Sequence, residues 1–241
     1  MRLLIIRHGD PDYSIDSLTE KGWREAELLK DRLLKLDIKS FYSSPLGRAR
    51  NTAKPTLEAL ERTAQICDWL REFDGYIIDP ATNEKRGPWD LMPAFWTANS
   101  DFYDRNKWLK TPLMQSGDVR EKYYAVCAGL DELIKKHGYV HDGNIFRVEN
   151  ENTDTVVLFC HFGVECVLLS HLLGISPVPL WHGFTALTSS VTTLVTEERE
   201  KGTAYFRCCG FSDISHLYAK DEPPSFQARF CETYSNFDER H

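Results

Sequence analysis

Two histidines stand directly after runs of apolar residues, where an imidazole ring could take part in chemistry. His8 follows the run at 3–6 within the tripeptide Arg-His-Gly, and His161 follows the run at 155–160. A neutral imidazole can act as a nucleophile, and an arginine such as Arg7 can bind an anion through paired N–H donors. Taken alone, however, the tripeptide fits a surface arginine beside a hydrogen-bonded histidine somewhat better.

A second arginine and a carboxylate complete the set of candidate chemical groups. Arg48 lies in the segment Ser-Pro-Leu-x-Arg-Ala-x-x-Thr-Ala, in which Ser44 is expected to cap a helix whose first residue is the following proline. Arg48 would then add its charge to that of the helix N-terminus. Glu72 follows a short apolar stretch and is our candidate general acid and base. The alternative is a solvated loop glutamate, with Asp10 and Asp74 as substitute acids.

Strands and helices alternate along the chain in the order that an α/β sheet requires. The apolar runs at 3–6 and 155–160 are typical of strands buried on both faces, in the middle of a sheet. Shorter strands are expected at 40–43 and 66–70, and a terminal hairpin at 190–196 and 203–209. Helices are expected from the cap Thr19 to Leu36, through 44–60, from Val119 to near Gly138, and from 164 to 173 before Gly174. This pattern predicts a three-layer α/β sandwich with a mostly parallel central sheet flanked by helices, and a ligand site at the carboxyl ends of the strands.

The segment at about 73–117 breaks this pattern, because it is rich in glycine, proline and aromatic residues. We interpret it as an inserted cap in an otherwise single domain at 1–241, since a loop this long inside a compact domain tends to be functional. The alternative is a satellite hydrophobic cluster that only packs against the sheet. The polar tail after Lys220 receives no assignment.

The composition argues against several classes of protein. A formal net charge of −7 and the lack of a Lys/Arg tract argue against binding to nucleic acid. The N-terminal apolar run is too short for a signal peptide or a membrane span, and the seven cysteines form no Cys-x-x-Cys pair. We therefore expect a cytoplasmic protein that does not associate with membranes and has neither structural disulfides nor a zinc site.

In their order along the chain, these motifs resemble those of the histidine phosphatase superfamily, also called phosphoglycerate mutase-like. The resemblance covers residues 2–72 and 119–217, and it includes the closing segment Ser-Asp-Ile-Ser-His-Leu at 212–217. The ordered agreement is specific for the superfamily. It says little about the substrate, because the shared residues bind only the phosphoryl group.

The resemblance implies a role for each candidate residue. His8 would attack phosphorus and carry the phosphoryl group as phosphohistidine, and Glu72 would be the general acid and base. Arg7, Arg48 and His161 would bind the phosphoryl oxygens, which carry negative charge that positioned donors stabilise. No Asp/Glu cluster with metal-ligand spacing stands beside these motifs. We therefore expect a mechanism with neither a metal nor a cofactor.

Three positions depart from the family pattern and bear on substrate contacts. Asp10-Pro11 stands where many members have Glu and a small hydroxyl residue, Ser14 where an asparagine often contacts the phosphate, and Phe162 where a glycine often follows the second histidine. Ser14 and Phe162 remain candidates for further phosphate contacts, Phe162 through its backbone N–H. No catalytic role is assigned to four other histidines: His137, His141, His171 and His182.

The sequence favours a phosphatase that hydrolyses a small phosphomonoester. In this interpretation the cap closes over the substrate, and its basic residues are candidate anion contacts: Lys85, Arg86, Arg105, Lys107 and Lys110. One alternative is a mutase of the phosphoglycerate mutase type, which returns the phosphoryl group to a different hydroxyl. Another is a non-catalytic protein that binds a phospholigand. The identity of the substrate and the oligomeric state do not follow from the sequence.

Overall fold

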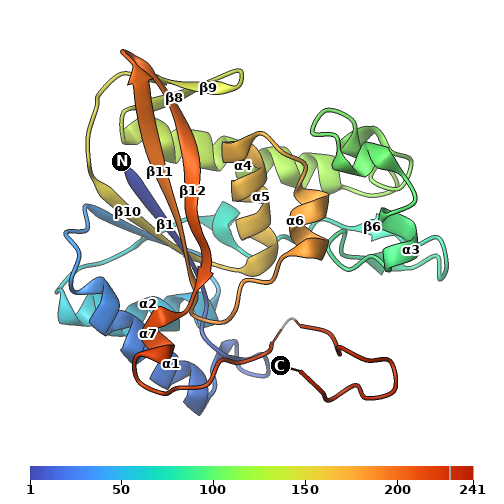
Figure 1. Ribbon diagram of the computed structural model, residues 1–241, viewed down its shortest axis with the longest axis horizontal. Helices are drawn as coiled ribbons and strands as arrows, with labels where there is room; N and C mark the ends of the chain where they lie inside the picture. Colours follow the sequence, from blue (N-terminus) through green and yellow to red (C-terminus); the bar gives the residue numbers. More distant parts are fainter. Residues whose placement is uncertain (228, 241) are drawn as a thin grey trace.

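An eight-stranded sheet forms the centre of the protein (Figure 1). The computed structural model describes residues 1–227 and 229–240. The strand order is β5-β4-β10-β1-β11-β12-β9-β8. In that order the strands span Gln65–Ile66, Ser40–Ser43, Thr155–Cys160, Arg2–Arg7, Val191–Glu200, Thr203–Asp213, Ile145–Val148 and Tyr139–Asp142. Within the described ranges, β2 (Pro11–Asp12) pairs with β3 (Ser17–Leu18), and β6 (Ile77–Ile78) with β7 (Lys85–Arg86), outside this sheet.

The sheet has a parallel half and an antiparallel half. β5, β4, β10 and β1 are parallel neighbours, whereas β11, β12, β9 and β8 extend the sheet through antiparallel pairs. Every residue of β10, and every residue of β1 after the first, is buried. The strands expected at 3–6 and 155–160 are therefore confirmed. The expected terminal hairpin forms as the longer strands β11 and β12.

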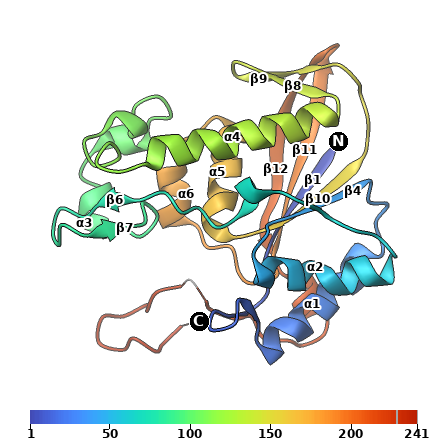
Figure 2. The same ribbon diagram turned by 180° about the vertical axis from the view of Figure 1, so that it is seen from behind.

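Helices cover both faces of the sheet, which confirms the predicted three-layer α/β sandwich (Figure 1 and Figure 2). One layer contains α1 (Glu20–Leu33) and α2 (Gly47–Ala59), with the short α7 (Ser215–Tyr218) beside α1. The other contains α4 (Val119–Lys136), α5 (Phe162–Leu173) and α6 (Pro177–Gly183). Along β1, Leu4 and Ile6 pack in the α1/α2 layer, and Leu3 and Ile5 in the α4/α5 layer. Among the described residues, no helix combines the length and apolarity needed to cross a bilayer.

The start of α2 differs from the prediction. The helix begins at Gly47, two residues later than expected, and Ser44 is not its cap. The Ser44 hydroxyl instead lies 2.8 Å from Nε2 of His161. The carboxylate of Asp16, which is distant in sequence, accepts a hydrogen bond from the N–H of Gly47 at 2.6 Å. Arg48 is nevertheless in the first turn, as predicted.

The prediction of a strand at 66–70 is wrong beyond its first residue. β5 ends at Ile66, and residues Asp68–Leu70 form a 3₁₀ turn. Ile66 pairs with Ser43, the last residue of β4, so the neighbouring strand offers no partner beyond this point. The β8–β9 hairpin was not predicted, and it forms the opposite edge of the sheet.

The segment at 73–117 is folded and packs beside α6 (Figure 2). It contains the β6–β7 pair, α3 (Pro93–Trp96) and 3₁₀ turns at Ser100–Tyr103 and Trp108–Lys110. Trp108 and Met114 are buried in the main core, and Trp96 stacks on His182 of α6 with ring centroids 5.1 Å apart. The aromatic residues of the segment therefore dock it on the domain. Its role as a cap remains a prediction.

The tail after Lys220 returns to the loop that follows β1. Glu222 forms ion pairs with Lys21 at 2.8 Å and Arg24 at 3.1 Å. Further on, the Ser225 hydroxyl donates to the carboxylate of Asp10. These contacts hold the tail beside the carboxyl end of the central strand.

Replacing Gly22 by alanine should destabilise the protein. A Cβ at Gly22 would clash with the backbone of Asp10, so α1 would have to move away from the loop after β1. We expect the free energy of unfolding, measured by urea denaturation, to fall by about 1–3 kcal/mol. Gly183→Ala is the matched control, because a Cβ there meets open space and should change stability by about 0.5 kcal/mol or less. Equal unfolding midpoints for both variants would contradict this account of the packing.

Candidate active site

The two candidate histidines lie side by side at the carboxyl ends of adjacent parallel strands. Register pairs Arg7 of β1 with Cys160 of β10, so the residues that follow them leave the sheet together. The ring centroids of His8 and His161 are 5.1 Å apart, and the planes are tilted by 58°. Both side chains are buried, with exposed fractions of 2% and 0%.

The hydrogen bond of His8 fixes its tautomer. Nδ1 lies 2.8 Å from the carbonyl oxygen of Gly9, which can only accept, so Nδ1 carries the proton and Nε2 keeps its lone pair. Burial, followed by the charges of Arg7 and Arg48, lowers the pKa of His8 well below 6.5. The backbone N–H of Gly9 donates to Thr52 Oγ1 of α2 at 2.8 Å, which holds this turn in place. His8 is therefore a neutral imidazole with a free nitrogen.

Arg7 is buried at the end of β1, and two backbone carbonyl groups hold one of its terminal nitrogens. Its Nη1 donates to the carbonyl oxygens of Ala186 at 2.5 Å and Gln227 at 3.0 Å. Its Nε is buried and has no hydrogen-bond partner among the described residues. The guanidinium thus retains an unpaired donor in the interior of the site.

Arg48 is positioned by the loop between β2 and β3. Its Nη1 donates to Asp16 Oδ1 at 2.7 Å, and its guanidinium lies 5.3 Å from the ring centroid of Tyr13. Although burial acts to raise it, the pKa of Asp16 is lowered, because Gly47 N–H and Arg48 donate to its carboxylate. Nε of Arg48 is also buried without a partner in the described ranges.

His161 presents a third unpaired nitrogen. Its Nε2 lies 2.8 Å from Ser44 Oγ, whereas its Nδ1 is buried and finds no partner in the described part of the chain. If the Ser44 hydroxyl donates to Nε2, Nδ1 carries a proton and is a donor. Burial and the charges of His8, Arg48 and Arg7 lower the pKa of His161 well below 6.5, so the ring is neutral.

Glu72 lies at the N-terminus of α5, the helix that begins directly after His161. Its Oε1 accepts hydrogen bonds from the backbone N–H of Phe73 at 2.8 Å and Val164 at 3.2 Å. Burial raises the pKa of Glu72, although these donors and the charge of Arg7 favour the ionised form. A half-buried carboxyl group with a raised pKa suits an acid.

Two buried carboxyl groups were missed by the sequence analysis. Glu25 of α1 accepts from Asp10 N–H and Thr188 Oγ1, both at 2.9 Å. Neither oxygen of Glu165, in the first turn of α5, has a hydrogen-bond partner within normal geometric limits among the described residues. Burial raises the pKa of each to about 7. The sequence could have revealed Glu25, because a glutamate on the apolar face of a helix, beside Ala26, is expected to be buried.

The remaining candidates lie at different distances from this cluster. Ser14 is exposed, and its hydroxyl donates to Asp12 Oδ1 at 2.5 Å. Phe162 is the first residue of α5, where helix N–H groups lack intrahelical partners. The two substitute acids are engaged elsewhere, Asp10 with Thr19 and Ser225, and Asp74 with Lys122. The contacts of Ser14 and Phe162 with a phosphate remain predictions.

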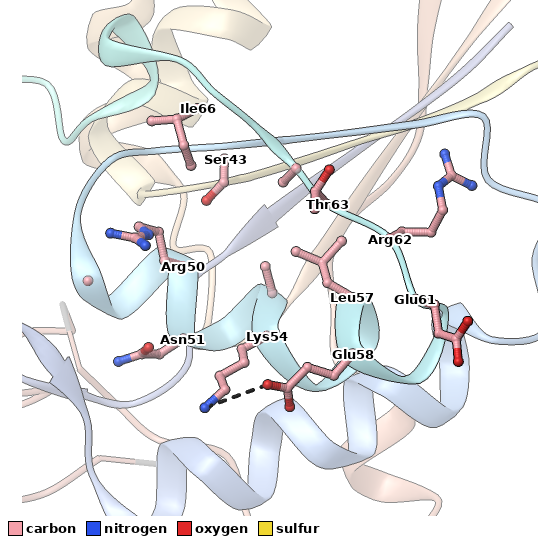
Figure 3. Close-up of a pocket in the computed structure, with 13 residues that line it drawn as sticks. Ser43, Arg50, Asn51, Lys54, Leu57, Glu58, Glu61, Arg62, Thr63 and Ile66 are labelled. Atoms are coloured by element: carbon pink, nitrogen blue, oxygen red, sulfur yellow. Dashed lines mark ion pairs between the residues drawn. The ribbon is translucent and has the colours of Figure 1, made fainter.

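Two clefts lie near these residues. One of about 430 Å³ has Glu72 in its wall, together with Arg71 and Lys122. Another of about 580 Å³ lies along α2, where Figure 3 shows Lys54 paired with Glu58. The wall of the second cleft contains none of the candidate site residues His8, Arg7, Arg48, His161 and Glu72, so we assign it no catalytic role.

Comparison with known proteins identifies sequence relatives of this chain. A sequence model of the histidine phosphatase superfamily (branch 1) matches residues 3–207. A probable phosphatase of Schizosaccharomyces pombe is 40% identical over 239 residues, covering 92% of this chain and 97% of that protein. A 2,3-bisphosphoglycerate-dependent phosphoglycerate mutase of Thermoplasma acidophilum is 43% identical over 61 residues, which is 21% of this chain and 30% of the mutase.

Solved structures share the fold. A mutant phosphoserine phosphatase of Entamoeba histolytica in complex with phosphoserine superposes with a TM-score of 0.57 at 19% identity. The match covers 90% of this chain and 98% of that protein. It supports the three-layer α/β architecture described above.

Replacing Glu165 by glutamine should flatten the pH dependence of stability. In the folded protein, burial raises the pKa of Glu165 from 4.5 to about 7. Protonated Glu165 therefore stabilises wild type fully below about pH 4.5, and this stabilisation is lost as the pH rises to about 7. By pH 8 the variant should gain up to about 3 kcal/mol relative to wild type. Urea unfolding between pH 4.5 and 8 measures this difference. The exposed Glu58→Gln is the control, and parallel profiles for wild type and Glu165→Gln would refute the prediction.

Proposed function

The chain belongs to the histidine phosphatase superfamily (branch 1), and we propose that it hydrolyses a small phosphomonoester through a phosphohistidine on His8. One observation carries the proposal. Three buried nitrogen atoms without protein partners in the described ranges, Arg7 Nε, Arg48 Nε and His161 Nδ1, belong to the residues around the free Nε2 of His8. Unpaired buried donors are costly unless a ligand accepts from them. A phosphoryl group offers three such oxygen acceptors.

In the first step, His8 Nε2 attacks phosphorus and the bond from phosphorus to the ester oxygen breaks. Arg7 and Arg48 donate to the phosphoryl oxygens, together with His161, and stabilise the charge that develops on them. Glu72 gives its proton to the leaving oxygen, so the alcohol departs neutral. The products are phosphohistidine, ionised Glu72 and the free alcohol.

In the second step, water hydrolyses the phosphohistidine. Ionised Glu72 takes a proton from the water as its oxygen attacks phosphorus, and the bond from phosphorus to His8 Nε2 breaks. The bond from Nδ1 to the Gly9 carbonyl keeps the ring in the tautomer that accepts and releases the phosphoryl group at Nε2. The cycle returns His8 neutral and Glu72 protonated.

The phosphatase proposal is favoured over a mutase by the extent of the sequence relationships. The match to a probable phosphatase spans 92% of the chain, whereas the match to the mutase spans 21%. A non-catalytic binding protein is disfavoured because His8, Glu72 and the three donor residues are all present in one cluster. We further propose a cytoplasmic location, which is supported by free thiols at all seven cysteines.

Replacing His8 by alanine should abolish phosphate release. We expect wild type to release phosphate from an aryl phosphate, and from members of a panel of sugar, nucleotide and amino-acid phosphates, in the presence of EDTA. His8→Ala should lose at least about 10³-fold in rate, because no nucleophile remains. His137→Gln is the control, since His137 contacts Tyr42 at the far end of α4.

Three outcomes of this assay separate the functions. Equal release by wild type and His8→Ala would refute the role of His8. Transfer between hydroxyl groups of a phosphoglycerate, with little free phosphate, would identify a mutase. Tight phosphate binding without turnover on any substrate would identify a binding protein.

Replacing Glu72 by glutamine should slow the hydrolysis of each substrate to an extent that depends on its leaving group. Alkyl phosphates need a proton on the departing oxygen, so kcat/KM for them should fall by about 10²–10⁴. The loss for p-nitrophenyl phosphate should be much smaller, because its leaving oxygen departs without a proton. Asp74→Asn is the matched carboxylate control.

The pH profile gives a second test of Glu72. In wild type, kcat/KM for an alkyl phosphate should decline as the pH rises through the raised pKa of Glu72, which must be protonated. At low pH it should decline only well below pH 6.5, where His8 becomes protonated. Glu72→Gln should lack the alkaline decline. An unchanged profile in this variant would contradict its role as the acid.

A further inference from the structure

Asp131, His141 and His171 come together outside the proposed active site. Asp131 Oδ1 lies 2.7 Å from His171 Nε2 and 3.3 Å from His141 Nδ1. The three atoms that could bind a metal lie within 4.8 Å of one another. Throughout the described ranges, no other group of three His, Cys, Asp or Glu side chains meets this condition.

The three residues come from three different elements. Asp131 lies on α4, His141 on β8 and His171 in the last turn of α5. The His141 ring stacks on Phe146 with centroids 4.8 Å apart and planes at 15°, which restricts its rotation. The side chains of Asp131, His141 and His171 are 34%, 19% and 14% exposed, so an ion can reach them from solvent. The cluster is therefore both oriented and accessible.

The spacing is close to that of a tetrahedral metal site. Bonds of about 2.0–2.1 Å from zinc to nitrogen and oxygen place neighbouring ligand atoms about 3.3–3.5 Å apart. The 3.3 Å separation of Asp131 and His141 already has this value. The 2.7 Å separation of Asp131 and His171 would need to widen by about 0.7 Å, which small side-chain rotations can supply.

We propose that this cluster binds a divalent transition-metal ion of the zinc type. Asp131 Oδ1, His141 Nδ1 and His171 Nε2 are the ligands, and solvent occupies a fourth position. Two imidazoles with one carboxylate suit such ions better than Mg²⁺ or Ca²⁺, which prefer all-oxygen sites. No zinc site was expected from the sequence, because the seven cysteines form no Cys-x-x-Cys pair. The three ligands proposed here are separated by 10 and 30 residues and form no recognisable motif.

The bound ion would fasten the edge of the sheet. The β8–β9 hairpin joins the sheet through two register pairs between β9 and β12, and in the described part of the chain β8 is the edge strand. A metal shared by β8, α4 and α5 would add a link from this hairpin to the helix layer. The ion would lie about 15 Å from His161, given ten residues of α5 at 1.5 Å per residue. Its role is therefore structural, and it takes no part in the proposed phosphoryl transfer.

Metal titration of the full-length protein tests the proposal. After treatment with a chelator and desalting, Zn²⁺ should bind with about one equivalent at this site by calorimetry and raise the Tm by several degrees. Co²⁺ should give the visible absorption of a tetrahedral site without a thiolate charge-transfer band. Asp131→Asn and His171→Gln should each weaken Zn²⁺ binding at least tenfold and remove the Tm shift.

Matched variants distinguish this cluster from other metal-binding groups. One equivalent of Zn²⁺ should still bind to three control variants: His137→Gln, His8→Ala and the double variant Cys208→Ser/Cys209→Ser. Phosphate release by Asp131→Asn should equal that of wild type. Should a ligand variant fail to fold, as judged by circular dichroism, His141→Gln and the Co²⁺ spectrum of wild type decide the question. Absence of binding in wild type, unchanged binding in the folded ligand variants, or a thiolate band would overturn the proposal.

Discussion

The burial of two guanidinium groups beside uncharged imidazoles is the constraint on which the arrangement of this site depends. Burial, together with the charges of Arg7 and Arg48, lowers the pKa of His8 well below 6.5 and holds the ring neutral. Asp16 pairs with one guanidinium, whereas carbonyl oxygens satisfy part of the other. Among the described residues, the Nε of each guanidinium has no hydrogen-bond partner. The site is therefore electrostatically incomplete in a way that an anion with several oxygens would correct.

Segments that are distant in sequence must meet to build this arrangement. The pairing of β1 with β10 brings the two histidines together, and α2 adds Arg48 through its first turn. The N-terminus of α5 holds Glu72 through a backbone N–H, so the same helix carries His161 at its start and contacts the proposed acid. The ends of regular elements thus place the site residues, and loop and tail residues such as Asp16 and Gln227 then hold the two arginines.

The sequence predicted what is encoded locally. Apolar runs located β1 and β10, and the motif order selected candidate residues that the structure brings together, because both signals lie within short segments. The cap of α2 was mispredicted, since Asp16 replaced Ser44 through a contact across the fold. Glu165 and the tail contact at Gln227 were missed for the same reason. Their surroundings come from elements far away in the chain, which no local pattern reports.

The pairing of β1 has a consequence for synthesis of the chain. β1 lies between β10 and β11, which begin about 150 and 190 residues later. At about 5–20 residues per second, the strand that leads to His8 waits about 10–40 s on the ribosome before both partners exist. During this interval its apolar run is an unpaired β-segment, and folding requires contacts of high sequence separation. The assembly of the catalytic centre is therefore a late event, and the nascent chain is open to aggregation or chaperone binding until β10 and β11 emerge.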